Sequence, residues 1–231
     1  MSIKFGVVVF PGSNCDHDAY YATKKILEFD SDFLWHKDTD LQNSDVIILP
    51  GGFSYGDYLR TGAIARFSPI MNSVINFANS GGIVIGICNG FQILLEAGLL
   101  PGVLLKNNST KFICKDVNIK IESKNNIFTK SISADVLKIP IAHGDGNYFA
   151  SEDVLKELED NDQVVFKYSS PAGAISDEFN PNGSLLNIAG ITNKNRNVLG
   201  MMPHPERATD SVLNKSDGGG IFRSIANNLI K

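Results

Sequence analysis

Three short apolar runs in the first half of the chain alternate with stretches that space their apolar residues at helical intervals, and this alternation constrains the fold more than any other feature. The runs, bounded by glycine or proline, cover residues 5–10, 45–50 and 83–87, and the helical stretches cover 16–29, 69–78 and 90–97. Strands that alternate with helices typically form a parallel sheet, because each helix carries the chain back to the end where the next strand starts. The sequence therefore predicts a parallel sheet with helices on both faces.

The second half of the chain contains shorter apolar runs separated by turns rich in Asn, Gly and Ser. They cover residues 117–121, 137–141, 164–168 and 185–191. Such spacing favours antiparallel strands. One more strand over 198–202 and a closing helix over 220–230 complete the pattern. Because no linker or repeat divides the chain, we expect one α/β domain over residues 1–231 with a mixed, mostly parallel central sheet.

The composition is typical of a globular protein that binds neither nucleic acid nor membranes. Hydrophobic residues make up 43% and charged residues 20%, and 25 acidic against 21 basic residues give a net charge of -4. The first apolar run is too short for a membrane span or a signal peptide. Cys15, Cys88 and Cys114 are odd in number and widely spaced, which argues against disulfides and a zinc site. We therefore expect a cytoplasmic protein without a bound metal.

Cys88 lies in the strongest local motif, Gly86-Ile87-Cys88-Asn89-Gly90, where a strand passes into a helix without a loop. Glycines two residues to either side give the spacing of a nucleophile elbow, in which neighbouring backbone passes too close for a Cβ atom. Such a turn presents the thiol at the carboxyl end of the sheet, so Cys88 is a candidate nucleophile. The alternative is a buried structural cysteine.

A cysteine nucleophile that releases an amine needs a histidine to protonate it, and a third group to orient that histidine. Of the four histidines, His204 is the best candidate because it lies in Met202-Pro203-His204-Pro205-Glu206, after the last predicted strand. The prolines favour extended backbone, in which residues two apart point the same way. Glu206 is therefore expected to hydrogen-bond His204. Taken alone, the segment could equally be a turn with an incidental charge pair.

The tetrahedral intermediate of such a reaction needs two N–H donors aimed at its oxyanion. The backbone N–H of Asn89, directly after the nucleophile, is one candidate. The other should come from a loop at the same edge of the sheet, and the turn Pro50-Gly51-Gly52-Phe53 follows a strand there. The alternatives are an ordinary turn or a phosphate loop, but the Gly-Lys-Ser/Thr ending of a phosphate loop is missing.

The other three histidines give weaker signals. His17 and His36 have no identifiable partner and are expected to be surface or packing residues. His143 lies in the polar glycine loop 142–148, just after an apolar strand. Function and turn structure are equally open for His143 at this point.

Together these segments resemble the class I, or triad, glutamine amidotransferases. The elbow Gly86-x-Cys88-x-Gly90-x-Gln92 and the distant His204-Pro-Glu206 carry this resemblance. Segments 50–60, 86–92, 143–148 and 202–207 are similar, more narrowly, to glutaminase subunits of phosphoribosylformylglycinamidine synthase. The match covers essentially the whole chain, and it implies a flavodoxin-like α/β fold with helices on both faces of the sheet.

The resemblance also implies a role for each motif residue. Three residues would form the catalytic triad, namely the nucleophile Cys88, the acid and base His204, and the orienting Glu206. Four more would bind the substrate or the oxyanion, namely Gly52 and Asn89 in the oxyanion hole and Gln92 and Phe53 beside the glutamine. Three positions depart from the family's usual residues while preserving charge, namely Asp145 in place of glutamate and Lys111 and Lys115 in place of arginines.

The resemblance further implies a reaction and its partners. The synthase converts formylglycinamide ribonucleotide to formylglycinamidine ribonucleotide in de novo purine synthesis, using glutamine as ammonia source and ATP. This chain offers no place for ATP, so ATP and magnesium are expected in a separate synthetase subunit, and no cofactor is expected here. A small third subunit would help to assemble the complex.

Two other functions fit part of the pattern. A hydrolase or stress protein with a Cys-His-Glu triad would share the elbow, but it would need neither Gln92 nor the extension over 53–60. A non-catalytic scaffold would keep the fold, but it would not need an intact triad.

Overall fold

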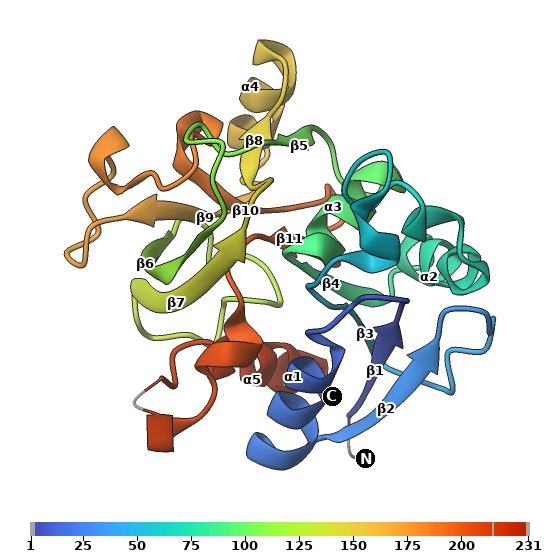
Figure 1. Ribbon diagram of the computed structural model, residues 1–231. Coiled ribbons are helices and arrows are strands. Elements are labelled where there is room, and N and C mark those ends of the chain that lie inside the picture. The colour runs from blue at the N-terminus through green and yellow to red at the C-terminus, as the bar shows by residue number, and fades with distance from the viewer. Residues whose placement is uncertain (1–2, 214, 230–231) are drawn as a thin grey trace.

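The computed structural model describes residues 3–213 and 215–229, and its main sheet has nine strands in the order β2-β1-β3-β4-β11-β10-β9-β6-β7 (Figure 1). These strands are β1 Lys4–Val9, β2 Asp30–Trp35, β3 Val46–Leu49, β4 Ile83–Ile87, β6 Ile113–Ile121, β7 Val136–His143, β9 Val164–Ser169, β10 Ile188–Thr192 and β11 Val198–Met201. A second sheet pairs β5 (Val103–Leu105) with β8 (Asn147–Phe149).

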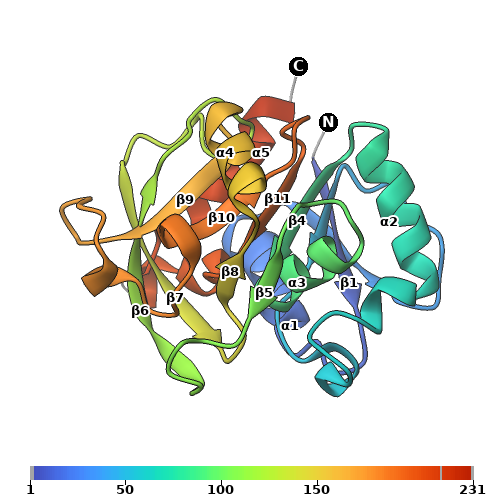
Figure 2. The same ribbon diagram turned by 90° about the horizontal axis from the view of Figure 1, so that it is seen from above.

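The main sheet has a parallel half and an antiparallel half. Strands β2, β1, β3, β4 and β11 pair in parallel. Strands β10, β9, β6 and β7 continue the sheet through antiparallel pairs. Every residue of β4 is buried, as expected for a parallel strand that is covered on both faces. Figure 2 shows the two halves side by side, with α2 at one flank and β6 and β7 at the other.

Helices cover both faces of the parallel half. Helix α1 (Asp16–Tyr21) connects β1 to β2, and α2 (Pro69–Asn79) lies between β3 and β4, on the other side of the strand order. Right-handed crossovers in opposite directions place these helices on opposite faces. Helix α3 (Asn89–Glu96) follows β4, and α5 (Gly219–Leu229) lies beside α1 (Figure 1), where the Phe222 ring centroid is 6.3 Å from that of Phe5.

The remaining helical segments are short or lie apart from the parallel half. Helix α4 (Glu152–Asp160) follows β8, and a π-helical turn over Ala22–Ile26 continues α1. The 3₁₀ turns are η2 Ser54–Asp57, η3 Ala65–Phe67, η4 Asp177–Phe179, η5 Leu185–Asn187, η6 Pro205–Ala208 and η7 Ser211–Leu213. No helix in the two described ranges is long and apolar enough to cross a membrane.

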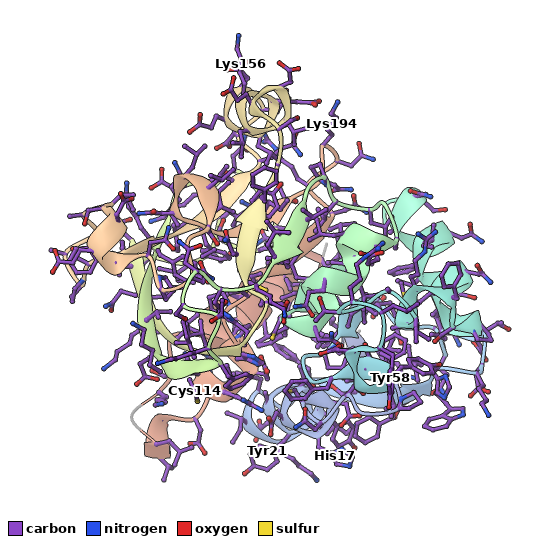
Figure 3. All side chains as sticks on the ribbon, turned by 45° about the horizontal axis from the view of Figure 1, so that its top comes forward. His17, Tyr21, Tyr58, Cys114, Lys156 and Lys194 are labelled. Carbon is purple, nitrogen blue, oxygen red and sulfur yellow. The ribbon has the colours of Figure 1, made fainter. Side chains whose placement is uncertain are left out.

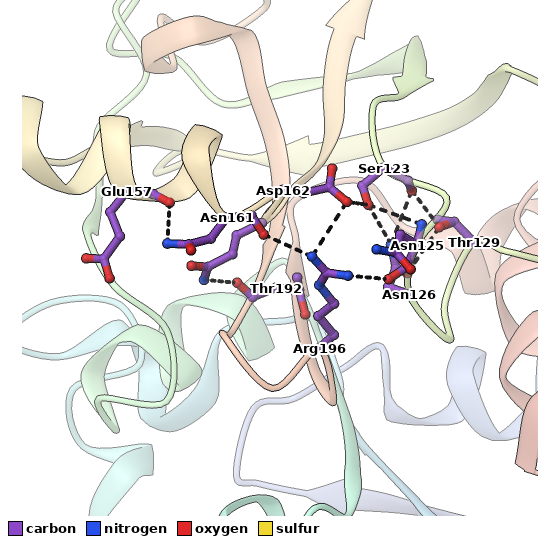
Figure 4. Close-up of polar contacts among 10 residues, drawn as sticks. Ser123, Asn125, Asn126, Thr129, Glu157, Asn161, Asp162, Thr192 and Arg196 are labelled. Carbon is purple, nitrogen blue, oxygen red and sulfur yellow. Dashed lines mark hydrogen bonds and ion pairs between the residues drawn. The ribbon is translucent and has the colours of Figure 1, made fainter.

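A polar network around Arg196 ties together the turn between β10 and β11, the end of α4 and the loop after β6 (Figure 4). Arg196 donates to the backbone carbonyls of Asn125 at 3.0 Å and Asn161 at 3.1 Å, and it lies 3.8 Å from the Asp162 carboxylate. Ser123 donates to the same carboxylate at 2.8 Å. The network therefore links three connections at the ends of β10, β9 and β6, which are neighbours in the main sheet.

Most predicted elements are present, including the parallel strands and the change to antiparallel pairing in the second half. Three strands and one helix were missed. Strand β2 begins with Asp-Ser-Asp, β5 and β8 have only three residues each, and α4 is strongly charged. The strand predicted over 185–191 starts as the turn η5 and becomes strand only at Ile188. The predicted end of the closing helix, Ile230, lies outside the described residues.

Candidate active site

Cys88 occupies the sharp turn between β4 and α3, with φ 51° and ψ -106°. Positive φ is uncommon for residues with a side chain, and such strain is often found at functional sites. A Cβ atom at Gly86 would lie 2.6 Å from the Gly90 carbonyl oxygen, and one at Gly90 would lie 1.9 Å from the Leu49 carbonyl oxygen. The two glycines therefore let α3 start directly against β3 and β4, as the elbow spacing predicts.

Three neighbouring strands bring the predicted triad to one edge of the sheet. Strands β3, β4 and β11 are adjacent and parallel, so their carboxyl ends deliver the Gly51 turn, Cys88 and His204 to the same place. Gly51 lies between the other two residues. A Cβ atom there would be 2.7 Å from His204 Cε1 and 3.4 Å from Cys88 Cβ. Only a residue without a side chain fits between the thiol and the imidazole.

His204 and Glu206 form a buried pair, with Nδ1 2.6 Å from the Glu206 Oε1 atom. The pairing was predicted correctly, but its predicted backbone was wrong. Glu206 lies in the 3₁₀ turn η6 rather than in an extended segment, because Pro205 favours the first position of a helical turn. The other ring nitrogen, His204 Nε2, has no hydrogen-bond partner within the described residues.

The charges around His204 favour its protonated form. Burial by itself lowers the pKa of His204, but the Glu206 carboxylate and the nearby sulfur atoms of Cys88 and Cys15 outweigh it and raise that pKa well above the ordinary value. A protonated imidazole can give its proton to a departing amine. The environment of His204 therefore suits a general acid.

Cys15 is a second buried thiol beside the triad, and its neighbours argue against a metal. One potential ligand atom from each of Cys15, His204 and Glu206 lies within 4.8 Å of the others, the sole such grouping within residues 3–213 and 215–229. However, the Arg207 guanidinium is 3.1 Å from Cys15 Sγ and also donates to Asp18 at 2.9 Å. This fixed positive charge opposes a bound cation.

Two backbone N–H groups beside Cys88 are available to an oxyanion. In the part of the chain that the structure describes, the N–H groups of Gly52 and Asn89 donate to no protein acceptor, whereas the N–H of Phe53 donates to the Gly12 carbonyl at 2.9 Å. Gly52 has φ 126°, which only glycine adopts readily. The geometry therefore leaves free the two donors expected for an oxyanion hole.

The Asn89 side chain links helix α3 to the loop that contains Gly52. Its Oδ1 accepts the Ser54 N–H at 3.0 Å, and its Nδ2 donates to Asp57 Oδ1 at 3.2 Å and to Gln92 Oε1 at 2.8 Å. Gln92 Nε2 in turn donates to the Asp145 carbonyl at 2.7 Å. The oxygen and the nitrogen of the Gln92 amide thus both form hydrogen bonds within the protein. A direct contact between Gln92 and the substrate glutamine stays a prediction.

A cavity of ≈ 190 Å³ lies beside Cys88, and its wall combines apolar and acidic residues. Phe53 and Phe112, which are 48% and 54% exposed, contribute rings whose centroids lie 6.3 Å apart. Asp57 and Asp145 are the acidic members of the wall. Tyr58 projects into solvent from the same loop as Phe53 (Figure 3). The cavity is the space next to the thiol in which a small substrate would lie.

Asp57, in the cavity wall, was not among the predicted site residues. Burial, its main influence, raises the pKa of Asp57 to about 6; the Asn89 hydrogen bond opposes this shift and the nearby Asp145 adds to it. The backbone of Asp57 is left-handed, with φ 53°. The only signal in the sequence was its position within the 53–60 extension, which carried the narrower family resemblance.

His143 lies in the cavity wall with a defined tautomer. Asn107 Nδ2 donates to the carbonyls of Lys111 and His143, so Asn107 Oδ1 must be an acceptor, and it receives the Gly146 N–H at 3.1 Å. His143 Nδ1, 3.0 Å from that oxygen, therefore carries the proton. Burial and the nearby charge of His204 lower the pKa of His143 to about 4. The neutral ring leaves Nε2, which has no partner in the described chain, as an acceptor.

The other histidines and Cys114 lie outside this site. His17 is exposed and pairs with Asp16 at 2.7 Å. His36 is a buried packing residue, one of the two predicted options, and its Nδ1 lies 2.7 Å from the Tyr55 hydroxyl, a partner that the sequence did not identify. That partner comes from a loop distant in sequence, so no local pattern could reveal it. Cys114 is exposed on β6 (Figure 3).

Comparison with known proteins identifies the family to which this chain belongs. Residues 2–220 match the CobB/CobQ-like glutamine amidotransferase domain. The chain belongs to this glutamine amidotransferase family. Among family members, it is 55% identical over 230 residues to the phosphoribosylformylglycinamidine synthase subunit PurQ of Salinibacter ruber, covering 99% of this chain and 98% of the relative. It is 57% identical over 221 residues to the same subunit of Synechocystis, covering 95% and 99%.

Solved structures of glutamine amidotransferases agree with the fold. A chain in the structure of PurLQS from Thermotoga maritima superposes with a TM-score of 0.86 and 43% identity, covering 99% of this chain and 100% of that one. A more distant glutamine amidotransferase from Thermotoga maritima, at 15% identity, has a TM-score of 0.59 and supports the fold alone. The predicted flavodoxin-like class I glutamine amidotransferase fold is thereby confirmed.

Proposed function

We propose that this glutamine amidotransferase is the glutaminase component of phosphoribosylformylglycinamidine synthase in purine biosynthesis. It hydrolyses glutamine to glutamate and ammonia with Cys88 as nucleophile, and it acts as one domain over residues 1–231. The observation that carries this proposal is the elbow thiol beside the buried His204–Glu206 pair, at the wall of a cavity large enough for a small amide. The relatives named PurQ support the choice of pathway.

In the first half of the reaction, Cys88 Sγ attacks the side-chain amide carbon of glutamine. The carbonyl oxygen becomes an oxyanion that accepts the N–H groups of Gly52 and Asn89. When the intermediate collapses, the carbon–nitrogen bond breaks and His204 gives its proton to the departing nitrogen. Ammonia leaves, and a glutamyl thioester remains on the sulfur.

In the second half, water attacks the thioester and His204 takes up the water's proton. The carbon–sulfur bond breaks, glutamate leaves and the thiolate of Cys88 is restored. Glu206 keeps its hydrogen bond to His204 Nδ1 throughout, so Nε2 is the nitrogen that exchanges protons. The buried position of this pair keeps the ring in one orientation during both halves.

The ammonia passes to an ATP-dependent synthetase partner that makes formylglycinamidine ribonucleotide from formylglycinamide ribonucleotide. ATP and magnesium bind to that partner, and a small third subunit helps to assemble the complex. The similarity to a chain of PurLQS supports a multi-subunit complex. We also propose a cytoplasmic location, because Cys88 works only as a free thiol and reducing conditions preserve it.

Glutamine-dependent ammonia release tests the proposal. The chain is assayed alone and with the synthetase subunit, the small subunit, ATP and the ribonucleotide, and Cys88→Ala is compared with the exposed control Cys114→Ala. Release should depend on Cys88, remain in the Cys114 variant and rise on assembly, because the isolated chain is expected to be a poor glutaminase. Full turnover by the chain alone would contradict the coupling to a partner, and no release under any condition would contradict the function.

A further inference from the structure

We propose that Asp57 and Asp145 together bind the α-ammonium group of glutamine and thereby select an α-amino acid over other small amides. This inference rests on the proposed function, because it places the substrate's amide carbon at Cys88. It adds the recognition of the opposite end of the substrate. Asp57 and Asp145 are positioning and specificity residues in this proposal, and they take no part in bond breaking.

The charge of the cavity wall is the first argument. Asp57 and Asp145 line the cavity beside Cys88, and no lysine or arginine does so among the described residues. The nearby Asp145 carboxylate adds to the raised pKa of Asp57, so the two negative charges lie close enough to repel. A cation between them would relieve this repulsion. The α-ammonium group is the cationic part of glutamine.

A buried histidine nitrogen without a hydrogen-bond partner independently supports this subsite. His143 lines the same cavity, is 3% exposed, and has an unprotonated Nε2 without a partner in the described chain. His143 thus adds one unpartnered acceptor nitrogen to a cavity whose wall already contains two carboxylates. Buried acceptors need donors. Glutamine brings N–H donors at both of its ends, through its ammonium group and its amide group.

The connection to the nucleophile is the third argument. Asn89, the residue after Cys88, donates to the Asp57 carboxylate, and Gln92 donates to the Asp145 carbonyl. Helix α3 therefore holds both acidic residues at fixed positions relative to the thiol. Four bonds separate the amide carbon of glutamine from its α-nitrogen, a reach of about 5 Å. Cys88 and the two acidic residues line one and the same cavity of ≈ 190 Å³, which matches a substrate of that length.

The test compares glutamine with glutaramate, which differs only by lacking the α-amino group. Ammonia release is measured for the assembled complex with its ATP and ribonucleotide, for the original chain, Asp57→Asn and Asp145→Asn. Asp153→Asn, an exposed substitution in α4, is the matched control. Each cavity variant should lose about tenfold to a hundredfold in kcat/KM for glutamine, mainly through KM, because a charge-assisted hydrogen bond is lost. With glutaramate, kcat/KM should change less than about threefold.

The outcomes separate this inference from the proposed function. If a cavity variant lowers kcat/KM equally for glutamine and glutaramate, it acts through the geometry of the elbow, and the ammonium subsite is refuted while the glutaminase function stands. If the original complex shows no Cys88-dependent release of ammonia from glutamine, the ammonium subsite and the proposed glutaminase function are both refuted. Partial recovery of the preference for glutamine in Asp57→Glu would support the subsite, because the longer side chain restores the charge.

Discussion

Replacing Asp57 by asparagine should make the folded chain more stable at neutral pH. The pKa of Asp57 is raised from 3.8 to about 6, mainly by burial, so ionised Asp57 destabilises the fold. A shift of about two pKa units corresponds to roughly 3 kcal/mol at about 1.4 kcal/mol per unit. Because the side chain is only partly buried, we discount this to about 1–2 kcal/mol. Asparagine keeps an oxygen that can accept the Asn89 hydrogen bond.

The pH dependence of this gain gives a sharper check than its size. The folded state holds the Asp57 proton more tightly than the unfolded state does, so below about pH 4 the carboxyl is protonated in both states and contributes no penalty. The penalty grows as the pH rises toward 6 and is constant above it. The advantage of Asp57→Asn should therefore be small near pH 4 and full at pH 7.

Urea-induced unfolding at several pH values measures this difference, with Asp153→Asn as the control. The full gain corresponds to a melting temperature higher by roughly 2–8 °C for a chain of this size. Equal stability of the variant and the original chain at pH 7 would refute the reasoning, and so would a gain that persists unchanged below pH 4. A confirmed gain would mean that Asp57 is kept despite a loss of stability, as expected for a residue that binds substrate.

Three further substitutions test other parts of the structure. Gly51→Ala should lower glutaminase kcat by about 100-fold, because a methyl group there would displace the His204 ring, whereas Gly220→Ala, where a Cβ atom meets only ordinary contacts, should not. Glu206→Gln should lower kcat by roughly 10²–10⁴-fold. Because this change removes the charge that raises the pKa of His204, the alkaline limb of the pH–rate profile should also move to lower pH. Arg196→Ala should lower the free energy of unfolding by about 1–3 kcal/mol through its lost hydrogen bonds and leave ammonia release unchanged, which urea unfolding and the glutaminase assay together would check.

The elbow and the parallel strands were predictable because their signals are local. The glycines on either side of Cys88 form a recognisable local spacing, although Gly90 is required by its close approach to Leu49 in β3. Buried parallel strands are continuous apolar runs. The pairing of His204 with Glu206 was also predictable, since the two residues are close in sequence. Its 3₁₀ backbone was not, because an extended segment and a tight turn can both bring such residues together.

The features that sequence reasoning missed depend on contacts between distant segments. The role of Asp57 in the cavity wall arises from a loop with several left-handed residues, which no propensity indicates, and from the Asn89 side chain that holds it. Cys15 reaches the triad from the start of α1, and His36 meets Tyr55 only in the folded chain. Short strands such as β5 and β8 exist because they pair with each other, although neither has enough residues to show a pattern.

The place of β11 in the sheet has a consequence for synthesis of the protein. It is the last strand among the described residues, yet it lies between β4 and β10 rather than at an edge. During synthesis, the edge of β4 that pairs with β11 therefore stays unpaired until β11 has been made. Until then His204 is also absent from the neighbourhood of Cys88. A chain stopped before β11 would contain Cys88, the proposed nucleophile, and all the residues that line the cavity, but not His204, the proposed base, so we expect it not to release ammonia from glutamine. Glutamine hydrolysis thus becomes possible only when the middle of the sheet is closed.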